Sequence, residues 1–339
     1  MESNALGQGH ITIRHVAIHA GVSIATVSRA LSGNRPMSPQ LQERVLTSVD
    51  ALGYHPNLVG RALRQKKTST IGLIIPDLEN PFFSALTQRI SRRFSDSGTD
   101  VLVISADNKL ELELRAVRSF LGRQVDGLVM IPCDENESGE AVQLASTHVS
   151  TLQLDRFVDG VDLSFVGCDN TSGINLVIAH IDEFVDEASQ PVIIIGGGSS
   201  TSSGRERVQE LTRHRPRSLV FDGDFSFDWG RRSIAEILSQ GIRRGTIVTT
   251  ADVIALGVTS ALTTTGNSVP KDFRVIGFDD VGVAYLAHPT LTTVSQPLAD
   301  MADSIFSFMI TNPQSSQLQA RRIFSPELVV RESSPASHN

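Results

Sequence analysis

Two short helical segments separated by a glycine occupy residues 12–31, and this spacing constrains the fold more than any other feature of the chain. Apolar side chains recur at helical intervals on both sides of Gly21, which permits a sharp turn between the segments. Ser23 is placed to cap the second segment, because a hydroxyl there accepts an amide hydrogen of the first helical turn. The pattern predicts a helix-turn-helix, with a small core formed by Ile13, Val16, Ala17, Val22, Val27 and Leu31.

A helix-turn-helix of this kind places its second helix against the edges of DNA bases. The side chains left pointing outward from that helix are Ile24, Ala25, Ser28 and Arg29. An Ala-Gly-Val turn also occurs in ordinary helical hairpins, which are the alternative at this point.

The charge of the chain is divided unevenly. Residues 11–68 hold eight basic and two acidic side chains, a net charge of +6, whereas residues 69–339 hold 22 basic and 34 acidic side chains, a net charge of −12. A basic head would attract DNA while an acidic body repels it, which confines contact to one end of the molecule. The alternative is a solvated basic surface, and the coincidence of the basic residues with the helix-turn-helix argues against it.

A third helix is predicted from Ser38 to Leu52, with Gly53 ending it. The sequence His55-Pro56-Asn57 then breaks the chain, and residues 58–64 form a segment too short to be a stable helix by itself in water. Gly60 inside that segment lowers its helix propensity by about 1 kcal/mol. We therefore expect residues 58–64 to become helical only against a partner.

From Thr70 onward, short apolar runs alternate with amphipathic stretches, which predicts parallel sheets covered by helices. The same rhythm restarts after Asp169, so the body should consist of two similar α/β lobes. Ligands of open parallel sheets bind at the carboxyl ends of the strands, and we expect a small molecule in the cleft between the lobes. The apolar runs are 71–75, 101–105, 127–131 and 151–154 in the first lobe, and 192–195, 219–221, 246–249 and 274–276 in the second.

The domain boundaries expected from these patterns cover the whole chain. They are a disordered extension at 1–10, the helix-turn-helix domain at 11–56, a hinge helix and linker at 57–69, a two-lobed body at 70–332 with lobe crossings near 169, 297 and 322, and a disordered tail at 333–339. No apolar run is long enough to span a bilayer and no secretory signal begins the chain, so a cytoplasmic protein without a membrane partner is expected. Cys133 and Cys168, the two cysteines, are too few and too far apart for a disulfide framework.

Ordered motifs throughout residues 11–333 resemble the lactose and purine repressor (LacI/GalR) family of bacterial transcription regulators. The resemblance implies an all-α helix-turn-helix head and a two-lobed body like that of periplasmic binding proteins. The motifs that carry it are Thr12-Ile-Arg-His-Val-Ala, Val22-Ser-Ile-Ala-Thr-Val-Ser-Arg, Gly53-Tyr-His-Pro-Asn, Arg61-Ala-Leu-Arg, Ile71-Gly-Leu-Ile-Ile-Pro-Asp, Asn80-Pro-Phe-Phe, Val125-Asp-Gly, Leu154-Asp-Arg, Gly223-Asp-Phe-Ser, Val275-Ile-Gly-Phe-Asp-Asp, Pro289-Thr-Leu-Thr-Thr-Val-Ser-Gln-Pro and Pro326-Glu-Leu-Val-Val-Arg-Glu-Ser.

The resemblance implies a set of DNA-binding residues. Arg29 is the expected base reader, since a guanidinium can bond both acceptors of a guanine, while Ile24 and Ala25 offer apolar contact to thymine methyl groups. Leu63 of the hinge helix is expected to wedge into the minor groove and bend the DNA when two copies pair. The other expected contacts are Ser23, Thr26, Ser32 and Asn34 with phosphates, and Ser28, Asn57, Arg61 and Arg64.

The resemblance also implies which residues bind an effector in the cleft. Aromatic faces can stack on a sugar or purine ring, while carboxylates and a guanidinium pair with its hydroxyls or heteroatoms. The expected residues are Phe82, Phe83, Asp155, Arg207, Phe225 and Asp279. Arg205 is an alternative to Arg207, because the preceding loop, residues 196–204, aligns loosely. That loop is itself a candidate phosphate cradle, although no lysine follows it as in a nucleotide-binding P-loop.

Some positions depart from the family pattern. Members often carry Asp at the position of His15, Ala at that of Gly60, Asn at that of Ala251 and Gly-Phe at that of Glu210-Leu211. The methyl side chain of Ala251 cannot hydrogen-bond a hydroxyl group, so the usual hydrogen bonds to the effector are fewer at this position.

The function expected from these features is a homodimeric transcriptional repressor that binds a pseudo-palindromic operator in double-stranded DNA under control of a small molecule, a sugar or sugar derivative. No catalytic group, metal site or cofactor is expected, since His180, His214 and His288 are scattered and Asp279-Asp280 alone is a weak metal site. The alternative is a sugar-binding transport-type protein without a DNA function, which shares the two-lobed body but has no basic head.

Overall fold

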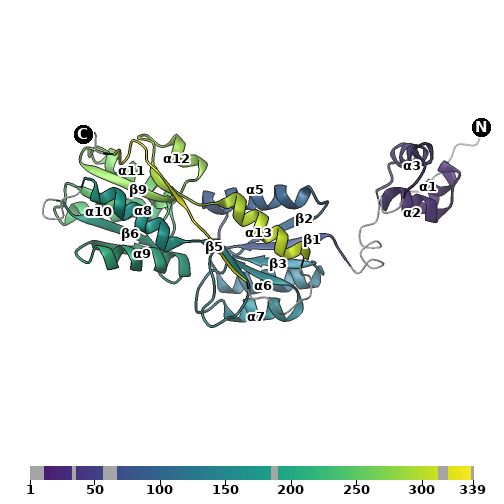
Figure 1. Cartoon of the computed structure of the whole chain (residues 1–339), viewed down its shortest axis with the longest axis horizontal. Coiled ribbons are helices and arrows are strands. Elements are labelled where there is room, and N and C mark those ends of the chain that lie inside the picture. Colours follow the sequence, from purple (N-terminus) through teal and green to yellow (C-terminus); the bar gives the residue numbers. More distant parts are fainter. Residues whose placement is uncertain (1–10, 33–35, 56–66, 185–189, 312–319, 337–339) are drawn as a thin grey trace, which may run out of the picture. The chain divides into compact units, whose positions relative to one another are not determined.

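A computed structural model describes residues 11–32, 36–55, 67–184, 190–311 and 320–336 of the protein. The chain divides into two compact units, residues 1–68 and 69–339. The described part of the first unit is helical, and the second unit combines helices and strands (Figure 1). No helix in the described ranges is long and apolar enough to cross a lipid bilayer.

The first unit, called the head from here on, contains the predicted helix-turn-helix. Its helices are α1 (Ile13–Ala20), α2 (Ile24–Ser32) and α3 (Pro39–Leu52). Gly21 and Gly53 end α1 and α3 in the left-handed conformation, with φ of 63° and 58°, which glycine adopts without steric cost. The amide of Thr26 donates to Oγ of Ser23 at 3.1 Å, which confirms the predicted cap of α2. The buried core of the head consists of Val16, Ala17, Ala20, Val27, Ala30, Val45 and Tyr54.

The second unit, called the body, has two lobes, each built on a six-stranded sheet. The first sheet is parallel throughout and has the strand order β11-β5-β4-β3-β1-β2. Its strands are β1 (Thr70–Ile75), β2 (Asp100–Ser105), β3 (Gly127–Met130), β4 (Thr151–Leu154), β5 (Phe165–Cys168) and β11 (Arg321–Phe324). The helices of this lobe are α5 (Pro81–Ser95), α6 (Leu110–Gly122), α7 (Gly139–His148) and α13 (Leu298–Thr311).

The second sheet has the order β12-β10-β9-β8-β6-β7, and only its edge strand β12 runs antiparallel to its neighbour. Its strands are β6 (Val192–Gly197), β7 (Leu219–Gly223), β8 (Gly245–Thr249), β9 (Phe273–Asp279), β10 (Thr292–Ser295) and β12 (Glu327–Val329). The helices of this lobe are α8 (Asn170–Asp182), α9 (Ser202–His214), α10 (Phe227–Ser239), α11 (Asp252–Thr264) and α12 (Gly282–Leu286). The two-lobed α/β fold expected from the sequence is thereby confirmed.

Each sheet buries both of its faces, which explains why the central strands are continuous apolar runs rather than alternating ones. Along β1, Ile71 and Leu73 join one core cluster while Ile74 joins the cluster on the opposite face. Along β6, Ile193 and Ile194 divide in the same way between the two cores of the second lobe.

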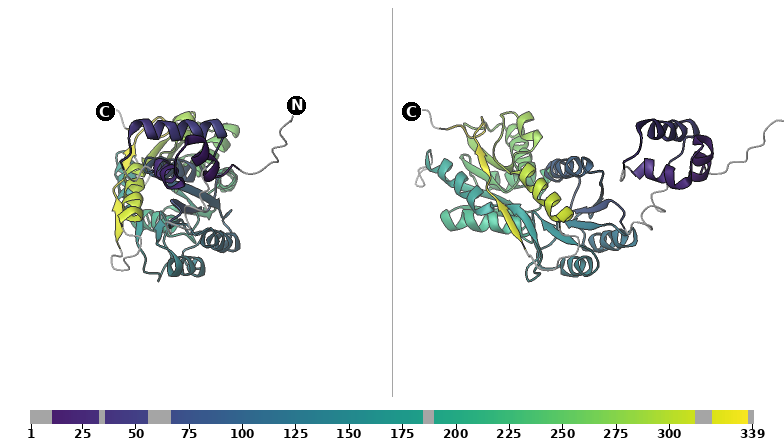
Figure 2. Two further views of the ribbon diagram at one scale, coloured as in Figure 1. Left: turned by 90° about the vertical axis from the view of Figure 1, so that its right-hand side faces the viewer. Right: turned by 45° about the vertical axis from the view of Figure 1, so that its right-hand side comes forward.

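The chain passes between the lobes after β5, after β10 and after β11. The last passage lies between Phe324 and Glu327, a few residues beyond the position expected near 322. Figure 2 shows this C-terminal segment, in yellow, running from one lobe to the other. Helix α13, which follows the second passage, packs its Met301 and Ile305 into the first lobe. Three segments of the chain therefore connect the two lobes.

The prediction that the chain is disordered from Ser333 is wrong for residues 333–336. Ser333 and Ser334 are fully buried. The amide of Thr292 donates to Oγ of Ser333 at 2.8 Å, and that hydroxyl donates to the carbonyl of Val275 at 2.6 Å. Polar composition indicated an exposed tail, but these small side chains instead satisfy backbone groups that the second sheet leaves unpaired. Residues 337–339 lie outside the described residues.

Candidate functional site

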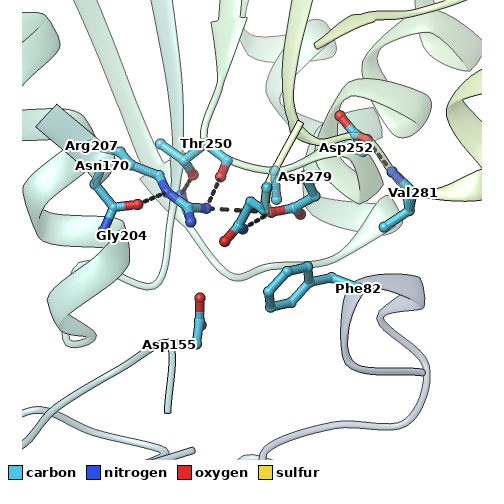
Figure 3. A network of polar contacts seen from close by, with 12 residues as sticks. Phe82, Asp155, Asn170, Gly204, Arg207, Thr250, Asp252, Asp279 and Val281 are labelled. Carbon is cyan, nitrogen blue, oxygen red and sulfur yellow. Dashed lines mark hydrogen bonds and ion pairs between the residues drawn. The ribbon is translucent and has the colours of Figure 1, made fainter. Parts of the chain in front are cut away.

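A small cavity lies between the lobes, where carboxyl ends of strands from both sheets face each other (Figure 3). Its volume is about 10 Å³, room for about one water molecule, and it is partly open to solvent. The residues that line it are Asn80, Phe82, Phe83, Asp155, Arg156, Ser203, Arg207, Phe225, Ala251 and Asp279. The structure therefore brings all six side chains expected to bind an effector to one cavity, and their role in binding remains a prediction.

Local structure explains how these side chains reach the cavity. Asn80 caps α5 by accepting the amide of Phe82 at 3.0 Å, so the aromatic pair begins a helix that starts at the cleft. Asp155 follows β4 directly, and Asp279 is the last residue of β9. Both aspartates have positive φ, 60° and 125°. Backbone strain of this kind persists where surrounding structure enforces it, and it clusters at binding sites.

Arg207 is held rigidly from α9. Its side chain is 3% exposed, and its Nε donates to Oδ1 of Asn170 at 2.8 Å while Nη1 donates to the carbonyl of Thr250 at 2.8 Å. The guanidinium also lies 3.7 Å from the centre of the Phe278 ring. Oδ1 of Asp279 is 3.6 Å from Nη1, so the two buried charges face each other across the cavity wall (Figure 3).

Arg205, the alternative to Arg207, lies elsewhere. Its Nε donates to the Glu135 carboxylate at 2.8 and 2.9 Å, and its side chain does not line the cavity. In the loop before α9, the candidate phosphate cradle, the amides of both glycines after Gly196 donate within the protein, which leaves fewer amides for an anion. Gly197 N–H donates to Oγ1 of Thr250, and Gly198 N–H donates to the carbonyl of Gly223.

Asp279 belongs to a cluster of buried carboxyl groups. Its Oδ1 accepts Nε2 of Gln296 at 2.7 Å, and burial raises its pKa to about 7 against the opposing effects of Arg207 and Gln296. Asp252, at the start of α11, accepts the amide of Val281 at 3.1 Å and the Thr293 hydroxyl at 2.5 Å. Burial, followed by the neighbouring Asp279, raises the pKa of Asp252 well above its usual value.

Among the buried carboxyl groups at the cavity, Asp155 is the one whose oxygens the protein leaves free to bind a ligand. It is 6% exposed, and burial raises its pKa despite the influence of Arg207 and Arg156. Figure 3 shows it pointing into the space below Arg207. Within the described residues its carboxylate accepts no hydrogen bond, so its lone pairs are free for donors on a ligand.

Sequence reasoning did not assign four of the lining residues, Asn80, Arg156, Ser203 and Ala251, to the site. Two of them had a signal. Arg156 follows Asp155 at the carboxyl end of a strand, and Ser203 lies one helical turn before Arg207, so both belong to faces already assigned to the cleft. Ala251 was recognised only as a departure from the family pattern.

In the head, α2 presents an exposed surface beside its buried face. Ser23, Ile24, Ala25 and Arg29 are exposed, and Thr26 and Ser28 are half-buried. Val27 faces the core as predicted, and Ala30, which was not predicted, is buried beside it, whereas the predicted Val22 and Leu31 are only partly buried. Ser32 ends α2, while Asn34, Asn57, Arg61, Leu63 and Arg64 lie outside the described residues. The assigned contacts with DNA bases and phosphates remain predictions.

The comparisons with known proteins agree with this architecture. Residues 12–57 match the bacterial regulatory proteins of the lacI family, and residues 199–334 match the periplasmic binding protein-like domain. The chain is 29% identical to the ribose operon repressor of Halalkalibacterium halodurans over 337 residues, which cover 97% of this chain and 98% of the relative. It is also 29% identical to catabolite control protein A of Priestia megaterium over 308 residues, 86% of this chain and 89% of the relative.

Solved structures show the same arrangement. The lac repressor dimer bound to operator and the anti-inducer ONPF has a TM-score of 0.83 and 26% identity, with 97% of this chain and 100% of that chain covered. A helix-turn-helix head joined to a two-lobed ligand-binding body defines a ligand-responsive transcription regulator. Residues 12–57 are a DNA-binding domain of the lacI family, and the chain is similar over nearly its whole length to repressors of that family. Members of this family are regulators rather than enzymes.

Proposed function

We propose that this protein is a cytoplasmic transcriptional repressor that binds a pseudo-palindromic operator as a homodimer and responds to a carbohydrate in its inter-lobe cavity. The lac repressor structure is a dimer on operator DNA, and another solved structure is a complex of the regulator CelR with cellobiose. The latter has 24% identity and a TM-score of 0.67. The match of residues 12–57 to a DNA-binding family argues against the transport-type alternative.

One observation carries the assignment of the ligand class. Asp155 and Arg207, from different lobes, face a cavity that also contains the rings of Phe82 and Phe83. Carboxylate and guanidinium groups can each bond two neighbouring hydroxyls, while aromatic rings cover the apolar face of a sugar. A ligand that contacts both lobes stabilises one arrangement of them. It thereby shifts the spacing of the two heads in a dimer and changes operator affinity.

Two linked measurements test the proposal. Full-length protein is first used to select duplexes from randomised DNA, and we expect a palindromic consensus bound by a dimer. Neutral sugars are then screened for a rise in the melting temperature of the protein and for a change in operator affinity. A strictly monomeric protein without sequence preference would contradict the repressor assignment. Asp155→Asn should abolish the response to a sugar that binds, whereas the exposed Asp222→Asn should leave it unchanged.

A further inference from the structure

Arg156 is a buried cation whose hydrogen-bonding capacity the protein does not use fully. Its side chain is 3% exposed and lines the inter-lobe cavity. Among the described residues Nε has no hydrogen-bond partner, and Nη1 reaches the carbonyl of Pro132 only at 3.4 Å. The guanidinium lies 5.3 Å from the ring centre of Phe83 in the first lobe and 5.1 Å from that of Phe225, contributed by the second lobe. The protein therefore fixes this charge at the junction of its two lobes.

Neither guanidinium of the cavity makes a hydrogen bond to a carboxylate. Nε of Arg156 is 3.8 Å from Oδ2 of Asp155, and Nη1 of Arg207 is 3.6 Å from Oδ1 of Asp279. Buried charges are costly unless they are both paired and hydrogen-bonded. Arg207 is nevertheless held by Asn170 and the Thr250 carbonyl, both at 2.8 Å, so the unmet requirement is that of Arg156.

The aspartates compensate these cations only in part. Burial raises the pKa of Asp155 and that of Asp279, and it also lowers the pKa of Arg156. An arginine nevertheless keeps its proton in proteins, whereas Asp279, with a pKa of about 7, is only partly ionised at neutral pH. Glu113, whose charge also acts on Arg156, is fully buried, and burial raises its pKa. A surplus of positive charge is left facing the cavity.

We propose that the ligand of this cavity carries an anionic group, phosphate or carboxylate, on its polyhydroxyl body, and that Arg156 binds this group. The proposal rests on the proposed function and narrows its ligand class from sugars in general to sugar phosphates and sugar acids. A guanidinium is suited to this task because its planar fork matches both anions. Asp155 then binds the hydroxyl groups of the ligand, because its oxygens can accept their hydrogen bonds.

The proposal is tested by isothermal titration of the full-length protein with inorganic phosphate and, separately, with acetate, at pH 7 and constant ionic strength. The variants are Arg156→Gln, which removes the charge, and Arg156→Lys, which keeps the charge but not the fork. Arg213→Gln is the matched control, since Arg213 lies on α9 with a side chain 66% exposed and outside the cavity. Melting temperatures without ligand are measured first, and the lysine variant serves if the glutamine variant does not fold.

We expect wild type and Arg213→Gln to bind at least one of the two anions with equal affinity, and Arg156→Gln to lose about tenfold or more, as for a lost hydrogen bond to a charged group. Tighter binding of phosphate than of acetate assigns a phosphorylated ligand, and the reverse assigns a sugar acid. Anion binding at the basic head would be the same in all variants. The proposal is overturned if neither anion binds better than chloride, or if both Arg156 variants keep the wild-type affinity.

Operator binding separates this proposal from the proposed function. Arg213→Gln should bind the selected operator as wild type does in the absence of ligand, because Arg213 is exposed on α9 and lies outside the cavity. A wild-type protein that binds operator and responds to neutral sugars only, without affinity for either anion, refutes the anionic ligand and leaves the repressor intact. A wild-type protein that shows no sequence-specific DNA binding refutes the assignment as a repressor.

Discussion

At the scale of single residues, the cavity is defined by carboxyl groups that burial keeps from ionising easily. Asp279 faces Arg207 and Gln296, with Asp155 and Asp252 nearby, and its pKa of about 7 compares with 3.8 for an ordinary aspartate. The folded protein therefore holds an additional proton at Asp279 between about pH 4 and pH 7. Stability contributed by this proton is present at low pH and is lost as the pH rises through 7.

We expect the free energy of unfolding of the body to fall between pH 5.5 and pH 8, and Asp279→Asn to remove part of that fall, on the order of a few kcal/mol. Asp155, Asp252 and Glu113 shift in the same direction and contribute to the fall as well. Urea unfolding at the two pH values measures the effect, and the exposed Asp222→Asn is the control. An identical pH dependence in wild type and Asp279→Asn would contradict the assignment.

Arg29 carries a second prediction at this scale. It lies exposed on α2, in the last turn of the helix that is expected to read DNA. Arg29→Ala should lose about 1 to 3 kcal/mol of discrimination at one guanine of each half-site, with nonspecific binding largely kept. Sequence selection with both proteins measures this change. An unaltered consensus would show that another side chain reads that base.

At the scale of elements, two loops at the ends of β3 and β6 connect the lobes across the cleft. Glu135 is 7% exposed and pairs with Arg205 at the start of α9, and its amide donates to the carbonyl of Ser200 at 2.8 Å. The amide of Phe157 also donates to the Ser202 hydroxyl, at 3.0 Å. These contacts join the two lobes across the cleft, and we expect a ligand larger than water to bind only when they separate.

A double-mutant cycle with Glu135→Gln and Arg205→Gln should give a coupling energy of about 1 kcal/mol in the stability of the body. Arg205 is one-third exposed, and solvent weakens its ion pair accordingly. Both single variants should also bind ligand faster, because opening is easier, which stopped-flow fluorescence of Trp229 can follow. Additive effects of the two substitutions would mean that the pair does not latch the lobes.

The elements also show where sequence patterns were sufficient and where they were not. Central strands such as β1 and β6 are continuous apolar runs, and buried parallel sheets require that pattern. Four strands, β5, β10, β11 and β12, were not predicted. β11 is exposed and carries no apolar run, and β5 and β10 are only four residues long. Asp155 and Arg207 were placed by family resemblance, whereas the role of Arg156 depends on two rings from different lobes, which no local pattern encodes.

At the scale of the whole molecule, the uneven distribution of charge along the chain bears on DNA binding. The segment 11–68 is basic and the remainder is acidic. Binding to DNA should therefore weaken steeply with salt, by a factor of about 10³ or more between 50 and 200 mM if six or more phosphates are contacted. Fluorescence anisotropy with the selected operator measures the slope. A flat response would contradict a basic head as the contact surface.

The seating of Ser333 and Ser334 inside the second lobe has a consequence for how the protein is made. Their hydroxyl and carbonyl groups complete a lobe whose first strand was translated some 140 residues earlier. Until Ser334 has left the ribosome, the hydrogen bonds of these two serines cannot form. Packing of that lobe can therefore be completed only after residue 334 has been translated. A reporter or affinity tag fused directly after Ser334 should therefore disturb folding. A tag attached through a spacer after Pro335 should be tolerated.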